Sequence, residues 1–394
     1  MATTRSGRRL SIALCVTVLA AFIVVLPAGA LAQPPSEAWC RADADRGVVF
    51  HSVWPTSDGG CILGGSGADG PLLEKTDARG GAVWTRALGN GVRGEMILFV
   101  QQMPDGGYIA FSSAQRLTRT DAEANPLWEY VLPAGKTARS LRGTADGGCV
   151  LAGEGGGAFL LRVAPGGSEA WNRTFGADAL RSVQPLSRGG YVAAGASGGL
   201  PLLIEVGADG EVLRREVYEG PGNGTFTAVQ PAGEGYILTF VPAAELAGLW
   251  SDGSLRPSLV RTDAEGEVLW QRPVAGDTDL LRYVMPDPSG GYVVLASGAG
   301  TMPGTGRSFL IGTDAEGREA WTRAFDDTVI TSLHLTDDGG CIMTGIRQAS
   351  DGAEAGVVIR LGAAPAAPAS TPGFGAVAAL AALPAALALA WRRR

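Results

Sequence analysis

Residues 331–345 read TSLHLTDDGGCIMTG, the clearest copy of a pattern that recurs along the chain. In each copy an apolar run leads into a Gly-Gly turn, and a Tyr or Cys then opens a second apolar run. Aligning the second glycine of the turn gives seven copies, at Gly60, Gly107, Gly148, Gly190, Gly235, Gly291 and Gly340. Successive copies lie 41 to 56 residues apart. This period, with four short apolar runs per copy, is typical of a β-propeller blade.

The turn of the repeat often reads Asp-Gly-Gly, as at Asp58 and Asp338. Asp-Gly is favoured in two-residue hairpin loops whose residues both have positive φ. We therefore expect each copy to contribute a two-residue β-hairpin at this point, and not a helix.

A second turn, Asp-x-x-Gly, is followed by a short run that ends in Trp. These tryptophans are Trp84, Trp128, Trp171, Trp270 and Trp321, while the fourth copy has Arg214 in this place. The seventh copy stops after its third apolar run, 357–361. The missing run is found near the other end, because residues 37–41, EAWCR, match residues 319–323, EAWTR. We therefore predict an all-β, seven-bladed propeller over residues 33–362, closed by the N-terminal strand that carries Trp39, with the tryptophans packing between blades.

The pairing of DGGY or DGGC with TDxxGxxxW resembles a family of secreted propellers related to PQQ-like and kelch-like repeats. The resemblance covers nearly all of residues 33–362. It implies the propeller fold and says little about activity, because this fold hosts many unrelated functions.

Net charge argues against a nucleic-acid partner. The formal charge is −7, but six of the 32 basic residues are arginines in end segments that contain no acidic residue. The remaining 26 basic residues face 39 acidic residues, so the body carries −13. Phosphate backbones are bound by Lys and Arg, which an acidic body does not supply in excess.

Both ends read as targeting segments. Residues 1–32 combine Arg5, Arg8 and Arg9 with an apolar run and the cleavage pattern Ala30-Leu31-Ala32, which predicts a signal peptide; the alternative is an uncleaved anchor. A spacer, 363–371, precedes residues 372–394, where Pro372-Gly373-Phe374 leads into an apolar stretch and three arginines. This tail resembles the archaeal PGF-CTERM sorting signal. The resemblance implies processing by an archaeosortase, removal of the tail, lipid attachment and display on the outer cell surface. The alternative is a plain C-terminal transmembrane helix.

Residues suited to catalysis or metal binding are scarce. Cys61, Cys149 and Cys341 occupy one repeat position, where we expect buried free thiols, and Cys40 lies on the predicted outer strand. The two histidines, His51 and His334, are not repeat-equivalent. We interpret the recurrent aspartates of the second turn, Asp77, Asp121, Asp263 and Asp314, as turn caps and not as a calcium site. We expect no cofactor and no metal.

Candidate binding residues are those that depart from the repeat. The insertion 242–257 contains Glu245, Trp250 and Asp252, and Trp250 has no packing role in the repeat. If the first strands line a central channel, its wall contains Trp54, Gln101, Arg142, Gln184, Gln230, Met285 and His334. The sequons at Asn172 and Asn223 are predicted glycosylation sites.

The sequence therefore favours a non-catalytic propeller anchored at the cell surface, monomeric, whose partner is a surface protein or a glycan. The membrane, through the tail or an attached lipid, and a sorting protease are its other expected partners. Two alternatives use the same fold: a quinoprotein-like oxidoreductase and a glycan-active enzyme.

Overall fold

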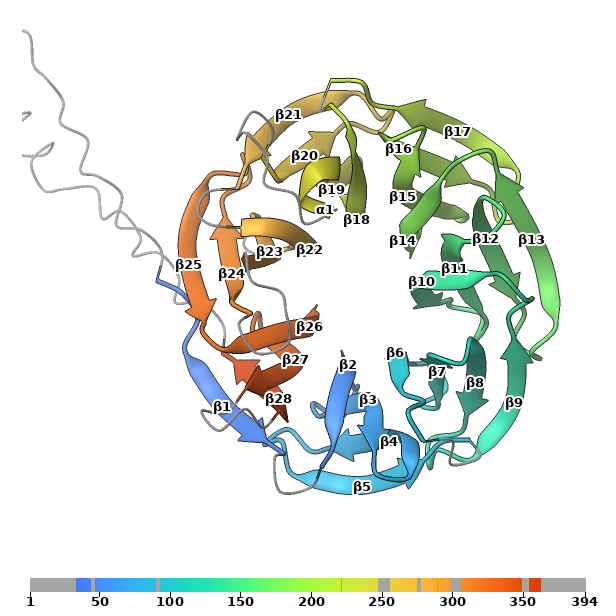
Figure 1. The fold of residues 1–394 in the computed structure, drawn as a ribbon, viewed down its shortest axis with the longest axis vertical. Coiled ribbons are helices and arrows are strands. Elements are labelled where there is room, and N and C mark those ends of the chain that lie inside the picture. Colours follow the sequence, from blue (N-terminus) through green and yellow to red (C-terminus); the bar gives the residue numbers. More distant parts are fainter. Residues whose placement is uncertain are drawn as a thin grey trace, which may run out of the picture.

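Seven four-stranded antiparallel sheets form a ring (Figure 1). The computed structural model describes residues 33–362, except 44–46, 90–92, 221, 247–255, 275–277, 289, 299–305 and 349–353. Within these residues α1 (Ala243–Leu246) is the single helix, and it is too short to cross a membrane. The chain is thus an all-β, seven-bladed propeller, as the repeats predict.

Each blade runs from an inner first strand to an outer fourth strand (Figure 1). Blade 1 contains β2 (Val49–Pro55), β3 (Cys61–Gly67), β4 (Gly70–Thr76) and β5 (Ala82–Ala87). Blade 2 contains β6 (Ile97–Gln102), β7 (Tyr108–Ser112), β8 (Arg116–Thr120) and β9 (Pro126–Val131). Blade 3 contains β10 (Thr137–Gly143), β11 (Cys149–Glu154), β12 (Ala158–Val163) and β13 (Glu169–Phe175). Blade 4 contains β14 (Ala179–Pro185), β15 (Tyr191–Ser197), β16 (Leu200–Val206) and β17 (Val212–Val217).

The remaining blades follow the same order. Blade 5 contains β18 (Gly224–Ala232), β19 (Gly235–Pro242), β20 (Ser258–Thr262) and β21 (Val268–Pro273). Blade 6 contains β22 (Thr278–Pro286), β23 (Tyr292–Gly298), β24 (Ser308–Thr313) and β25 (Glu319–Phe325). Blade 7 contains β26 (Thr328–Leu335), β27 (Cys341–Gln348), β28 (Glu354–Leu361) and, from the other end of the chain, β1 (Glu37–Ala42).

Ring closure occurs as predicted. Strand β1 pairs antiparallel with β28, with Trp39 opposite Arg360. The backbone N–H of Gly362 donates a hydrogen bond of 2.9 Å to the carbonyl oxygen of Ser36. The two ends of the described chain are therefore neighbours, and closure leaves no blade without its fourth strand. Strand β28 begins at Glu354, three residues before the run that the sequence indicates.

The hydrophobic core is divided among the blade interfaces. Seven clusters of buried side chains are present, and each joins two neighbouring blades. For example, Phe50 of blade 1 shares a cluster with Ile342 of blade 7. The ring is therefore stabilised by apolar side chains that are buried between the faces of neighbouring blades, and not within a single sheet.

The repeat tryptophans bridge neighbouring blades, as the sequence predicts. Trp171 Nε1 donates to the carbonyl oxygen of Ala208 in the next blade at 2.9 Å, and its ring meets Tyr191 edge-on. The same ring lies on Gly210, where the Cβ of any larger residue would come within 2.9 Å of it. A larger residue than glycine at position 210 would thus have to displace the ring of Trp171, whereas blade 2 has Ala124, also with positive φ, at the equivalent turn position beside Trp84.

Arg214 takes over this role in blade 4. Its Nη1 donates to the carbonyl oxygen of Ala264 at 2.9 Å, the position in blade 5 that corresponds to Ala208 in blade 4. A neighbouring position changes with it. Most third strands carry a basic residue that pairs with the aspartate before the Gly-Gly turn, such as Arg360 with Asp338 at 2.7 Å. In blade 4 the charges are reversed, because Glu205 of the third strand pairs with Arg188 of the turn.

The Asp-Gly-Gly turns differ from the prediction. In the first blade Thr56 N donates to Gly60 O at 3.0 Å and Gly59 N donates to Thr56 O at 2.9 Å. Only Gly59 has positive φ, +83°, and Asp58 does not. The loop therefore has three residues, a type I turn followed by a left-handed glycine, and the two-residue prediction was wrong. Asp58 instead accepts hydrogen bonds from Thr56 and Lys75. Partial burial by itself would raise the pKa of Asp58, but these hydrogen bonds outweigh it and lower the pKa to about 2.

The other recurrent residues have the structural roles expected of them. Asp77 Oδ1 accepts backbone hydrogen bonds from Arg79 and Gly81, each 2.8 Å, and so caps its turn. The four described cysteines are unpaired, three of them buried in the repeat position and Cys40 exposed.

Candidate functional site

A β-bulge in every first strand shapes the central channel. The pairing with the second strand skips at least one residue in each blade, for example between Ala138 and Ser140. A bulge inserts an extra residue and resets the alternation of side chains. Arg139 and Arg142, three apart in β10, would face opposite sides of a regular strand, yet both line one cavity.

This cavity, called the arginine pocket below, has a volume of about 270 Å³. It lies between the starts of the first strands, and the described side chains of its wall include Arg139, Arg142, Arg181, Arg282, Tyr283, Phe99, Thr227 and Ser332. A second cavity of about 380 Å³ lies toward the Gly-Gly turns. Both cavities are lined by one layer of side chains, namely Trp54, Gln101, Arg142, Gln184, Gln230 and His334. The structure thus places the predicted channel residues in the channel and brings Arg142 and His334 together.

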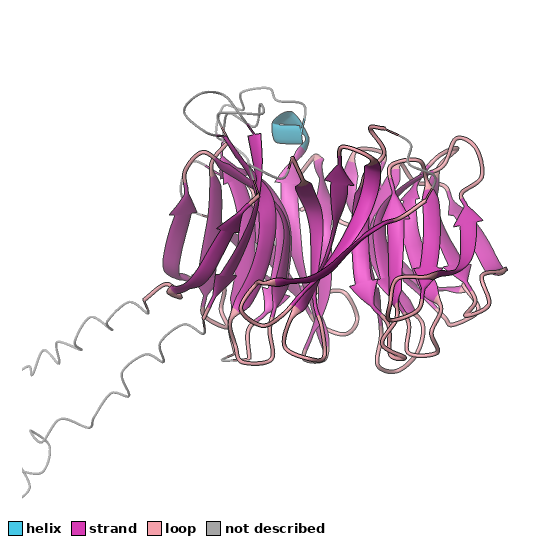
Figure 2. Ribbon diagram, turned by 90° about the horizontal axis from the view of Figure 1, so that it is seen from below, coloured by secondary structure: helices cyan, strands magenta, loops and turns pink. Residues whose placement is uncertain are grey.

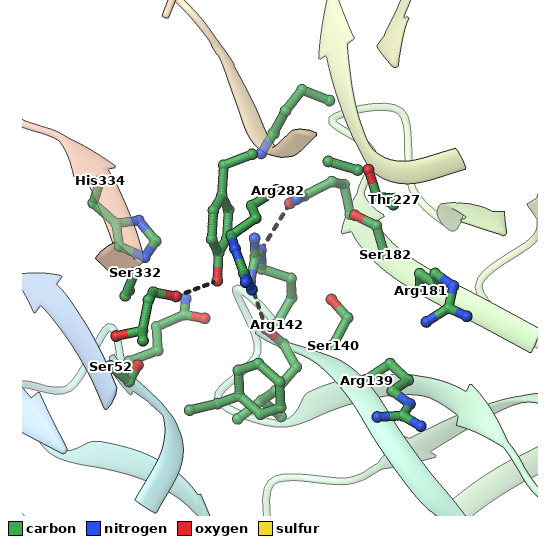
Figure 3. Close-up of a pocket in the computed structure, with 18 of the residues that line it drawn as sticks. Ser52, Arg139, Ser140, Arg142, Arg181, Ser182, Thr227, Arg282, Ser332 and His334 are labelled. Carbon is green, nitrogen blue, oxygen red and sulfur yellow. Dashed lines mark hydrogen bonds between the residues drawn. The ribbon is translucent and has the colours of Figure 1, made fainter. Parts of the chain in front are cut away.

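Positive charge dominates the arginine pocket. Four arginines line it, whereas none of its described wall residues is Asp or Glu. Arg139 is neutralised by Glu154, whose Oε1 accepts from Arg139 Nε at 3.0 Å. No carboxylate of the described chain forms an ion pair with the other three, which reach into the channel from β10, β14 and β22 (Figure 3).

These three arginines keep much of their hydrogen-bonding capacity. Arg142 donates from Nε to Gln184 Oε1 at 3.0 Å and from Nη1 to its neighbour's carbonyl oxygen, and Arg282 donates from Nε to Ser297 Oγ at 2.9 Å. Desolvation lowers the pKa of both Arg142 and Arg282. The buried Nε of Arg181 and Nε2 of Gln184 have no acceptor in the described part of the chain.

Aromatic rings complete the wall. The rings of Trp54 and His334 are 4.3 Å apart between centroids and tilted by 55°. Burial, with a further contribution from Arg142, lowers the pKa of His334 to about 3, so the imidazole is neutral at physiological pH. The Tyr283 hydroxyl donates to the carbonyl oxygen of Thr331 at 3.2 Å, and burial raises the pKa of this phenol.

Inner serines fix the wall by joining neighbouring first strands. Ser140 Oγ accepts from Val183 N at 3.2 Å, and Ser182 Oγ accepts from Val229 N at 3.2 Å. Each serine belongs to one blade and its donor to the next. Strands β10 and β14, which carry Arg139, Arg142 and Arg181, are therefore held in register with each other.

The other predicted binding residues belong to the blade 5 insertion. Glu245 belongs to α1, at the start of the blade 5 insertion, but its side chain lies outside the described residues, as do Trp250 and Asp252. The motif Pro372-Gly373-Phe374 also lies outside them. Asn172 is in β13, where its Oδ1 accepts from Lys136 Nζ at 2.7 Å, and Asn223 is exposed just before β18.

Sequence reasoning missed Arg139, Arg181 and Arg282. They occupy the bulge position of their strands, where the pairing with the second strand skips a residue. The sequence signal that could have revealed them is an Arg in the same place in three first strands, directly before Ser140, Ser182 and Tyr283. In the described ranges no group of three or more His, Cys, Asp or Glu side chains is placed to hold a metal ion.

Comparison with known proteins identifies the tail and the fold. Residues 371–393 match the PGF-CTERM motif. No curated protein sequence matches the chain. The fold is similar to BamB from Moraxella catarrhalis, with a TM-score of 0.51 and 14% identity over 83% of this chain and 100% of that one. It is also similar to the WD40 propeller domain of Doa1, with a TM-score of 0.56 and 14% identity over 82% and 96% of the two chains.

A third similar structure is the WD40 domain of Pan2 from Neurospora crassa, with a TM-score of 0.55 and 12% identity over 82% and 94%. At these identities the likeness concerns the fold alone. The chain is a seven-bladed propeller that ends in a PGF-CTERM cell-surface sorting motif.

Proposed function

We propose that this protein is a non-catalytic binding protein held at the outer face of the cell membrane. In this proposal residues 1–32 direct export, 33–362 form the binding ring, 363–371 are a tether and 372–394 are the sorting signal. The tether has nine residues, which span at most roughly 30 Å. The ring would therefore work close to the membrane, as a monomer, on a surface protein or a glycan.

The arrangement of the two faces supports this proposal most directly. Gly362, next to Ser36, ends the described chain beside the Gly-Gly turns, because Leu361 pairs with Cys341. Figure 2 shows α1 on the opposite face of the ring. The first strands begin at that face, and the residues that line the arginine pocket place the pocket toward it. A ring tethered at its turn face would present the pocket outward, to ligands outside the cell.

The composition of the channel favours binding over catalysis. A general acid or base needs a group that titrates near the working pH, and a quinone cofactor of the oxidoreductase type would need a carboxylate for its calcium ion. The described wall offers arginines, a neutral histidine and a phenol with a raised pKa. These groups bind and orient ligands more readily than they transfer protons.

Location and activity can be tested on the same cells. Antibodies against the purified ring should label intact cells, and replacing Pro372-Gly373-Phe374 by three alanines should abolish membrane retention or trap the precursor. Labelling only after the cells are opened would contradict the proposal. Reduction of a redox dye by the protein with quinone and calcium would contradict its non-catalytic part.

A further inference from the structure

We propose that the arginine pocket binds a small ligand that bears a compact oxyanion, a carboxylate, sulfate or phosphate group, held by Arg142, Arg181 and Arg282. This inference deepens the proposed function, on which it rests for the ligand's arrival from outside the cell. It concerns a site that the repeat does not create, because each of the three arginines differs from its counterparts in most other blades.

The first argument is uncompensated charge. Charged side chains that leave bulk water are usually paired, because burial of an isolated charge is costly. Arg142 and Arg282 lie deep enough for desolvation to lower the pKa of each, yet neither forms an ion pair within the described chain. An anionic ligand would supply the missing opposite charge.

The charge of the pocket also contrasts with the rest of the molecule. The body carries an excess of acidic residues, 39 against 26, but the described pocket wall has four arginines and no carboxylate. A cavity lined by one sign of charge within low-dielectric walls concentrates ions of the opposite sign. The pocket is thus the place where an acidic protein attracts an anion.

The second argument is unused donors. Arg142 uses Nε and Nη1 for protein acceptors, Arg282 uses Nε, and no described residue accepts from Arg181. The remaining guanidinium N–H groups form planar pairs, which match the two oxygens of a carboxylate or of a sulfate or phosphate ester. Figure 3 shows the three arginines around one space, with Ser182 and Thr227 on the same wall.

The third argument is size and shape. A volume of about 270 Å³ is just below the range of about 300–1,000 Å³ that is usual for small-molecule pockets. Trp54 and His334 offer ring surfaces beside the arginines, which suit a compact apolar or sugar-ring body. An acidic monosaccharide unit would offer both a charged group to the arginines and a ring to Trp54 and His334. A free inorganic anion would contact the arginines only.

Calorimetric titration of the full chain, purified in mild detergent, tests the site. The probes are sulfate, inorganic phosphate and glucuronate, with glucose as the uncharged match of glucuronate. We expect the anions to bind and glucose not to bind. Tighter binding of glucuronate than of sulfate would identify an acidic sugar as the ligand class, whereas equal binding would identify a free oxyanion.

The matched variants are Arg181→Gln and Arg282→Gln, with Arg86→Gln on the exposed outer strand β5 as the control. Each pocket variant should weaken anion binding at least about tenfold, as expected for loss of a charged hydrogen-bonding partner, while Arg86→Gln should leave binding unchanged. Arg139→Gln should have a smaller effect, because Glu154 already neutralises Arg139. If a Gln variant does not fold, Arg181→Lys retains the charge but removes the planar donor pair, and should also weaken binding.

Absence of heat with all three anions at 10 mM (roughly the limit for a weak site) would overturn the proposal. Binding that persists unchanged in both pocket variants would overturn it as well. Neither result would affect the surface labelling of intact cells, so failure of this inference and failure of the proposed location are distinguishable.

Discussion

Trp39 Nε1 donates a hydrogen bond to the carbonyl oxygen of Ala78, 3.1 Å away, and so joins the strand that closes the ring to the first blade. The same contact recurs between Trp128 and Pro165 at 2.8 Å. Because the strand of Trp39 comes from the beginning of the chain and completes the last blade, this contact joins the last blade to the first. The contact that repeats around the ring is therefore also the contact that closes it.

Trp39→Ala should destabilise the ring by about 2 kcal/mol or more, through lost packing and a cavity at the closing interface. Chemical denaturation monitored by circular dichroism measures this change. Val83→Ala, on an exposed part of the outer strand β5, is the control and should stay within about 0.5 kcal/mol of the unmodified protein. Equal stability of the two variants would show that closure does not depend on Trp39.

Arg214 is expected to be replaceable by the residue that the repeat prescribes. Arg214→Trp keeps a donor for the carbonyl oxygen of Ala264 and should change stability by less than about 1 kcal/mol. Arg214→Ala removes both the donor and the packing and should cost about 1–2 kcal/mol. Thermal unfolding compares them. A large loss in Arg214→Trp would mean that the guanidinium charge itself is required beside Glu205, its partner across the strands.

The thiols should fall into two classes. Burial raises the pKa of Cys61 to about 11 and the pKa of Cys149 and of Cys341 to about 12, so these thiols stay protonated at pH 8. Only thiolates react rapidly with disulfide reagents. A colorimetric thiol assay on the processed protein at pH 8 should therefore detect Cys40 alone, and three more thiols after denaturation. Rapid native reaction of more than one thiol would contradict this assignment.

Glycosylation should distinguish the two sequons. Asn223 is exposed in a connecting segment, whereas Asn172 lies within β13, pairs with Leu161 and accepts a hydrogen bond from Lys136. We expect glycan at Asn223 and little or none at Asn172, as seen by mass spectrometry of peptides from the native protein. Full occupancy of Asn172 would require modification before blade 3 folds.

The sequence predicts the ring better than the pocket, for a physical reason. Blade number and closure follow from repeated residues such as Trp171 and from the match around Trp39, which are visible in any alignment of the copies. The direction in which a side chain points depends on strand alternation, and a bulge reverses it. Arg142 lies after the bulge and was assigned correctly to the channel, while Arg181, at the bulge, was not.

Anion binding in the arginine pocket should not vary between pH 5 and pH 8. Guanidinium groups are not deprotonated in proteins in this range, and Tyr283 stays neutral because burial raises its pKa. His334 is the only described wall residue whose ordinary pKa lies in this range, but burial and Arg142 lower it to about 3. A lowered pKa keeps the imidazole uncharged above pH 5, so it adds no positive charge as the pH falls toward that value. Titrations with sulfate at pH 5, 6.5 and 8 should give equal affinities, in His334→Gln as in the unmodified protein. An affinity that rises below pH 6.5, and does so only when His334 is present, would show that the imidazole becomes protonated beside the anion.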